Sequence, residues 1–223
     1  MIAIILARGG SKGVPGKNIK ELNRIPLLAY PIIAAKNAKN ISNVYVSTDD
    51  KIIRKVALDY KAKVIDRPEK LAQDNSLDID AMKHAVNYLN YSGNIVHLRA
   101  TTPMIESSIL DDAIEYFLAN NKCTALRSAH ESSESAYKLF KQTNEYWSGL
   151  FDDTFEGDYY NWPRQKLPKT YQPNGYIDIL KTNWFMDNNS LHGNKILSYI
   201  TDYAHEVDTQ DDLKILRALY DKN

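Results

Sequence analysis

Short, uninterrupted apolar runs recur along the first half of the chain and predict buried strands. The first covers residues 1–7, is rich in isoleucine, and is followed at once by a glycine-rich stretch. A strand that is apolar at consecutive positions is buried on both faces, as in the middle of a parallel sheet. Further runs of this kind occupy residues 43–47, 62–65 and 94–98. We therefore expect four strands of one sheet in this region.

Segments with apolar residues at helical spacing separate these runs. They predict helices at residues 27–38, 51–60, 78–89 and 109–118. Asp49 or Asp50 is placed to cap the second helix. Strands that alternate with helices predict an α/β fold with a doubly wound, mostly parallel sheet. Ligands bind such sheets at the carboxyl ends of the strands, so the residues that follow each run are candidates for a site.

The periodicity lapses between residues 129 and 169, where Ser, Glu, Tyr, Asp and Pro crowd together. We interpret 129–169 as an arm of hairpins inserted into an α/β domain formed by 1–128 and 170–223. Within that domain, 176–180 has strand character and 209–219 is a predicted helix. The arm is rich in large aromatic side chains, which are costly to expose, so we expect it to pack against a second copy in a homodimer. These aromatics are Tyr137, Phe140, Tyr146, Trp147, Phe151, Phe155, Tyr159, Tyr160 and Trp162.

Composition limits the classes of partner. The chain has 223 residues with 43% hydrophobic and 25% charged, which is ordinary for a globular protein. Lys+Arg and Asp+Glu balance at 28 each, so no overall field favours nucleic acid or an anionic membrane. A single cysteine, Cys123, excludes an internal disulfide. No apolar run approaches the roughly 20 residues of a membrane span, and we expect a cytoplasmic protein with a small-molecule partner.

The decisive chemistry follows the first strand, in the stretch ARGGSKGVPGKN that runs from Ala7 to Asn18. Its four glycines let backbone N–H groups converge on an anion without interference from side chains. Three cations in the same stretch, Arg8, Lys12 and Lys17, can neutralise a triphosphate and its leaving pyrophosphate. The glycine and lysine spacings fit neither a Walker A loop nor a dinucleotide fingerprint. The pattern indicates a metal-dependent nucleotidyltransferase.

This stretch closely resembles the opening motif of the acylneuraminate cytidylyltransferases, the CMP-sialic acid synthetases and their relatives. Other blocks follow in the family's order: STDD from Ser47, RP at Arg67 with LAQD from Leu71, LRATTP from Leu98, RQKLP from Arg164 with PNG from Pro173, and EVDT from Glu206. The likeness runs over essentially the whole chain. It implies a Rossmann-like nucleotidyltransferase fold with a small dimerisation insertion.

The resemblance also implies roles for individual residues. A CTP site would be formed by Ala7, Arg8, Gly9, Gly10, Ser11, Lys12, Lys17, Asn18, Arg67 and Arg99. Lys138, Arg164, Tyr171 and Asn174 would face an acidic sugar, and Glu206 and Asp208 would bind Mg²⁺. Arg8, Lys12 and Asp208 are the implied catalytic residues. The implied reaction is attack by the anomeric hydroxyl of a sialic-acid-like 2-keto-3-deoxy sugar acid on the α-phosphate of CTP, which releases pyrophosphate.

Several positions depart from the family's pattern. Glu206 replaces an aspartate, Arg99 a glutamine and Ala100 a proline, while Asp78 stands where small hydroxyl residues are usual and Gln172 where arginine is common. Arg99 and Gln172 motivate an alternative, a guanylyl- or uridylyltransferase that acts on a sugar 1-phosphate. A second alternative is a non-catalytic nucleotide-sugar binding module. His84 and His97 are interpreted as packed or surface residues without a role.

Overall fold

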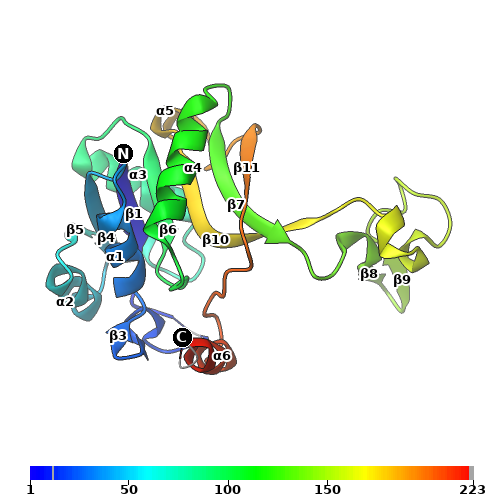
Figure 1. Ribbon diagram of the computed structural model, residues 1–223, viewed down its shortest axis with the longest axis horizontal. Coiled ribbons are helices and arrows are strands. Elements are labelled where there is room, and N and C mark those ends of the chain that lie inside the picture. Colours follow the sequence, from blue (N-terminus) through cyan, green and yellow to red (C-terminus); the bar gives the residue numbers. More distant parts are fainter. Residues whose placement is uncertain (12, 221–223) are drawn as a thin grey trace.

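A seven-stranded sheet forms the centre of the molecule (Figure 1), in the strand order β11-β7-β10-β6-β1-β4-β5. The computed structural model describes residues 1–11 and 13–220. The strands are β1 (Ile2–Leu6), β4 (Asn43–Thr48), β5 (Lys63–Asp66), β6 (Ile95–Arg99), β7 (Ala125–Glu131), β10 (Tyr171–Leu180) and β11 (Ile196–Ile200). All neighbouring pairs are parallel except those of β10, which is antiparallel to both β6 and β7. The mostly parallel α/β architecture predicted from the sequence is confirmed.

Helices cover both faces of this sheet. They are α1 (Ala29–Asn37), α2 (Lys51–Asp59), α3 (Asp78–Leu89), α4 (Ser107–Ala119), α5 (Thr182–Asp187) and α6 (Gln210–Tyr220). Ala3 and Ile5 of β1 pack in the core with residues of α1, α2 and α4, whereas Ile2 and Ile4 pack with residues of α3 and α5. Successive side chains of a strand point to opposite faces, so β1 needs apolar residues at every position. This two-sided burial explains the continuous apolar run over residues 1–7.

Short elements complete the chain. The remaining strands are β2 (Glu21–Leu22), β3 (Ile25–Pro26), β8 (Phe140–Thr143) and β9 (Tyr146–Gly149). The 3-10 helices are η1 (Lys17–Ile19), η2 (Glu69–Leu71), η3 (Ala136–Lys138), η4 (Tyr159–Asn161) and η5 (Arg164–Lys166). A small separate core brings Leu22 and Leu27 together with Val207, Leu213 and Leu216 of the C-terminal segment. The two ends of the chain therefore pack against each other.

The predicted elements of the first 120 residues agree with the structure within a few residues. Asp50 is the N-cap of α2, where its carboxylate accepts hydrogen bonds from the N–H groups of Ile52 and Ile53. The strands β7 and β11 were not predicted. Polar residues such as Arg127, Ser128 and His130 interrupt the apolar pattern of β7, and β11 alternates between exposed and half-buried positions at the sheet edge.

The arm is shifted relative to the predicted 129–169, because β7 extends to Glu131 and β10 begins at Tyr171. Residues 132–170, called the arm from here on, project away from the sheet at the far ends of β7 and β10 (Figure 1). Part of its aromatic content forms a core of its own: Tyr159 is fully buried, Tyr137 contacts Phe151, and Phe155 stacks on Tyr159. Tyr146 and Trp147 on the β8–β9 hairpin remain 75% and 67% exposed. The arm is thus partly self-supporting and still presents aromatic surface.

Among the residues that the structure describes, none of the helices combines the length and the apolar character needed to cross a membrane.

Candidate functional site

The glycine-rich loop leaves the carboxyl end of β1 in the middle of the sheet. The N–H of Gly9 donates to the carboxylate of Asp49 at 3.1 Å, and the Asn18 side-chain amide donates to the carbonyl oxygen of Arg8 at 2.9 Å. Val14 is fully buried and anchors the middle of the loop. Gly16 has a φ of +66°, a left-handed conformation that glycine adopts without strain, and it turns the chain into η1. The loop is therefore fixed at both ends and in the middle.

A cavity of about 540 Å³ lies beside this loop. Eight of the residues predicted for the site line it: Arg8, Ser11, Lys17, Asn18, Arg67, Arg99, Glu206 and Asp208. They come from the ends of β1, β5 and β6, from the loop and η1 that follow β1, and from the segment before α6. Parallel strands bring their carboxyl ends to one edge of a sheet, which is why residues so distant in sequence meet. A larger cavity of about 1190 Å³ lies between α1, α4 and the segment before α6, and none of the predicted site residues that the structure describes lines it.

The cations of the cavity are held by carboxylates. Arg8 lies 2.9 Å from Asp74, Lys17 lies 2.8 Å from Asp208, and Arg99 lies 3.7 Å from Asp78. Arg67 is buried and donates to the carbonyl oxygen of Ser47. Burial lowers the pKa of its guanidinium, while the charges of Asp49 and Asp78 act in the opposite direction. The four cations that line the cavity are thus balanced by four carboxylates, and a phosphate ligand could replace the carboxylate partners.

The predicted metal-binding carboxylates reach the cavity from an extended segment. Glu206 accepts a hydrogen bond from the Thr101 hydroxyl at 2.8 Å, and the N–H of Val207 donates to the carbonyl oxygen of Thr101. Val207 is fully buried between them, so Glu206 and Asp208 share the opposite side, as alternation along an extended chain requires. The described residues contain no group of three or more side chains arranged to bind a metal. Any metal here would need oxygens from a ligand in addition to this pair.

The other predicted residues lie outside the cavity or outside the described chain. Ala7 is buried, and Gly9 and Gly10 belong to the loop without lining the cavity. Lys12 lies outside the described residues.

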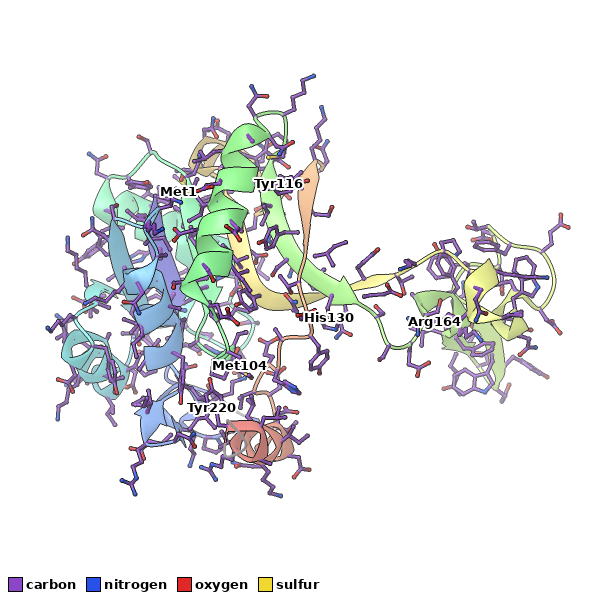
Figure 2. The ribbon with its side chains drawn as sticks, viewed as in Figure 1. Met1, Met104, Tyr116, His130, Arg164 and Tyr220 are labelled. Atoms are coloured by element: carbon purple, nitrogen blue, oxygen red, sulfur yellow. The ribbon has the colours of Figure 1, made fainter. Side chains whose placement is uncertain are left out.

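The four predicted sugar-binding residues do not reach the cavity of their own chain. Asn174 is 3% exposed, accepts from Ser128 and donates to Thr201, which fixes the irregular part of β10. Tyr171 pairs with Glu131 at the base of the arm. Lys138 and Arg164 lie on the arm itself, and Figure 2 shows Arg164 well away from the sheet.

Two residues without a predicted role are part of the site region. His97 lines the cavity, and buried Asp178 lies behind it with its carboxylate 3.9 Å from the ring. The sequence offered one indication for His97: it lies two positions before the predicted site residue Arg99, and residues two apart on a strand share a face. For Asp178 the signal was a lone acid in the apolar stretch YIDIL. The interpretation of His97 as merely packed is therefore incomplete.

Comparisons with known proteins agree with this geometry. A sequence model of the family described as "Cytidylyltransferase" matches residues 2–176. The chain is 31% identical to post-translational flagellin modification protein B of Campylobacter coli, over 98% of the chain and 94% of that protein. It is 30% identical to N-acylneuraminate cytidylyltransferase of Escherichia coli O18:K1:H7, over 95% of the chain but only 49% of that protein. A solved structure of CMP:2-keto-3-deoxy-manno-octonic acid synthetase complexed with CTP shares the fold, with a TM-score of 0.75 at 17% identity, covering 99% of this chain and 98% of that one.

The contact between the loop and the carboxylate segment leads to a prediction. A Cβ atom added at Gly13 would lie 2.8 Å from the carbonyl oxygen of Asp208, whereas one added at Gly10 would meet nothing within 4 Å. Gly13→Ala should therefore force the two segments apart and lower the free energy of unfolding by about 1–3 kcal/mol. Gly10→Ala should change it by less than about 0.5 kcal/mol. Urea denaturation of the free protein measures both, and equal effects of the two substitutions would contradict the packing described.

Proposed function

The chain belongs to the cytidylyltransferase family, and on that basis we propose that it transfers CMP from CTP to the anomeric hydroxyl of a sialic-acid-like 2-keto-3-deoxy sugar acid, releasing pyrophosphate. One observation carries the proposal: a single cavity is lined both by cations of the glycine-rich loop and by two adjacent carboxylates. The sugar acid as acceptor is supported by the relative from Escherichia coli that is named an N-acylneuraminate cytidylyltransferase.

The loop binds the triphosphate in this mechanism. The Ser11 hydroxyl and those N–H groups of the loop that are not bonded within the protein donate to phosphate oxygens. Arg8 and Lys17 exchange the carboxylates of Asp74 and Asp208 for phosphate. Catalysis is positioning and charge stabilisation, because nucleotidyl transfer builds negative charge on the α-phosphate and the leaving pyrophosphate. Cations held in place before the ligand arrives need little reorganisation during the reaction.

Mg²⁺ is the proposed cofactor, and Glu206 and Asp208 would hold it. The donor set fits, because Mg²⁺ prefers hard oxygen ligands and is usually bound by one or two carboxylates together with phosphates and water. When bound, the ion would neutralise phosphate charge beside the loop. Asp208 also pairs with Lys17, so the same carboxylate connects the metal site to the phosphate site.

A substrate screen tests the proposed function. Each of the four NTPs is combined with N-acetylneuraminic acid, with 2-keto-3-deoxy-manno-octonic acid and with sugar 1-phosphates, and pyrophosphate release is measured with Mg²⁺ and with EDTA. We expect release with CTP and a sugar acid that EDTA abolishes. Release with GTP or UTP and a sugar phosphate would overturn the proposal, and nucleotide binding without any release would indicate a binding module.

Lys12 provides a test of the loop's role. Lys12→Ala should lower turnover by about 10²-fold or more. The substitution removes a cation that would stabilise the negative charge developing on the phosphates in the transition state. Lys20→Ala is the matched control, since Lys20 follows the loop and does not line the cavity. Steady-state pyrophosphate release measures both variants. Near-normal turnover of Lys12→Ala would refute this role.

We further propose that the protein is a homodimer in which each arm completes the cavity of the other copy. Lys138 and Arg164 are cations on an arm that extends away from the sheet (Figure 2), and neither lines the cavity of its own chain. A carboxylate ligand calls for such cations. The exposed Tyr146 and Trp147 supply aromatic surface of the kind found at protein interfaces.

Mixing two defective chains distinguishes this arrangement. Arg164→Ala and Asp208→Asn chains are co-expressed with different tags, and doubly tagged dimers are purified. If the arm acts on the partner, one of the two cavities in each dimer has both residues, and turnover recovers to about half that of the wild type. Turnover no higher than that of either variant alone would mean that Arg164 acts in its own chain or not at all.

A further inference from the structure

A row of ionisable side chains crosses the sheet behind the cavity. His97 on β6 lies opposite Asp178 on β10, which in turn lies opposite Arg127 on β7. Residues directly opposite on neighbouring strands share a face of the sheet. Here it is the face covered by α3 and α5, because Ile95 and Leu180, two positions away from His97 and Asp178, belong to that core. Charged groups thus occupy a stretch of the sheet that is otherwise apolar.

Asp178 is the centre of this row. It is 3% exposed, and its carboxylate lies 3.3 Å from Nε2 of His192, 3.9 Å from Nδ1 of His97 and 3.6 Å from Nε of Arg127. Burial acts to raise the pKa of this carboxyl, but the hydrogen bond from His192 and the charge of Arg127 outweigh it and lower the pKa. Asp178 is therefore ionised at neutral pH.

His97 is neutral by contrast. It is 2% exposed, and burial, helped by the nearby charge of Arg99, lowers its pKa to about 4. A neutral imidazole carries one proton, on the nitrogen that faces the better acceptor. Nδ1 is buried without a hydrogen-bond partner among the described residues, and the anion it faces is Asp178. The proton therefore belongs on Nδ1, which leaves the lone pair on Nε2 while the ring lines the cavity.

We propose that His97 is a specificity-determining residue whose Nε2 accepts a hydrogen bond from an O–H or N–H group of the acceptor sugar, with Asp178 as the positioning residue that fixes the ring's tautomer. This inference rests on the proposed function. It assigns His97 to the sugar because β6 lies on one side of β1 and its phosphate loop, whereas β5, which leads to Arg67, lies on the other. The resemblance places Arg67 in the CTP site, on the β5 side of the loop, so the flank formed by β6 and β10 is left for the acceptor.

The lone pair on Nε2 also distinguishes the acid group of the sugar from its hydroxyl and acylamino groups. A carboxylate or carbonyl oxygen can only accept hydrogen bonds, so the lone pair of Nε2 disfavours it. Arg99, two residues further along β6, offers donors on the same flank of the cavity. The resemblance implies that Arg99 contacts CTP, whereas its place beside His97 assigns it to the acid group of the sugar. The acid group is thus directed towards the cations, and a hydroxyl or acylamino N–H towards His97.

Substitution of His97 tests its role. His97→Phe keeps an aromatic ring of similar shape without an acceptor and leaves a donor of the bound sugar unpaired. We expect KM for the sugar acid to rise about tenfold or more and KM for CTP to stay within about twofold.

His84→Phe is the control, because His84 on α3 does not line the cavity, and it should leave both KM values unchanged. An active wild type whose sugar KM is the same in His97→Phe overturns this inference alone, whereas a wild type that releases no pyrophosphate from CTP overturns the proposed function.

A spectroscopic measurement does not depend on the folding of any variant. The chain has 5 histidines, and the ¹⁵N shifts of their ring nitrogens report the position of each proton. For His97 in the wild-type protein at neutral pH we expect a neutral ring with the proton on Nδ1. A proton on Nε2, or a doubly protonated ring, would remove the acceptor and overturn the proposal.

Discussion

The site depends on a contact between the two ends of the chain. Lys17 of the glycine-rich loop pairs with Asp208 at 2.8 Å, although the two residues are 191 positions apart, and Gly13 packs against the carbonyl oxygen of the same residue. The pair is largely exposed on the Asp208 side, so its contribution to stability is small. What holds the ends together is the apolar core around Val207, together with the hydrogen bond from Val207 to Thr101. The phosphate loop and the carboxylates thus become one site only when the whole chain has folded.

Charge balance explains how a cavity built for phosphates exists without them. Each of the pairs Arg8–Asp74, Lys17–Asp208 and Arg99–Asp78 combines a cation with a carboxylate inside the cavity. Cations gathered alone would repel one another and lose solvation. The paired carboxylates reduce the repulsion between the cations and replace part of the lost solvation. When phosphate binds, the carboxylates release these cations, and Asp208 would then bind Mg²⁺. Binding of two anionic substrates therefore needs no net positive charge on the chain, which has none.

Much of the α/β core could be predicted from the sequence, because two-sided burial and helical spacing are local signals. The ends of α3 were predicted to the residue, and the loop was recognisable because strand, glycines and cations coincide. The strands β7 and β11 were not predicted, because their polar residues interrupt the local apolar pattern. In β7 these residues are paired with residues distant in sequence: Arg127 with Asp178, and Ser128 with Asn174. The same reason hid His97, whose position in the cavity depends on the pairing of β6 with β1 and β10. Asn174, assigned to the sugar by its motif, holds β10 in shape in this chain.

The most direct test of the account is a crystal structure of the protein with CTP and Mg²⁺. We expect the triphosphate against the glycine-rich loop, with Arg8 and Lys17 on phosphate oxygens in place of Asp74 and Asp208. A nucleotide bound elsewhere, with the loop empty and both ion pairs intact, would contradict it.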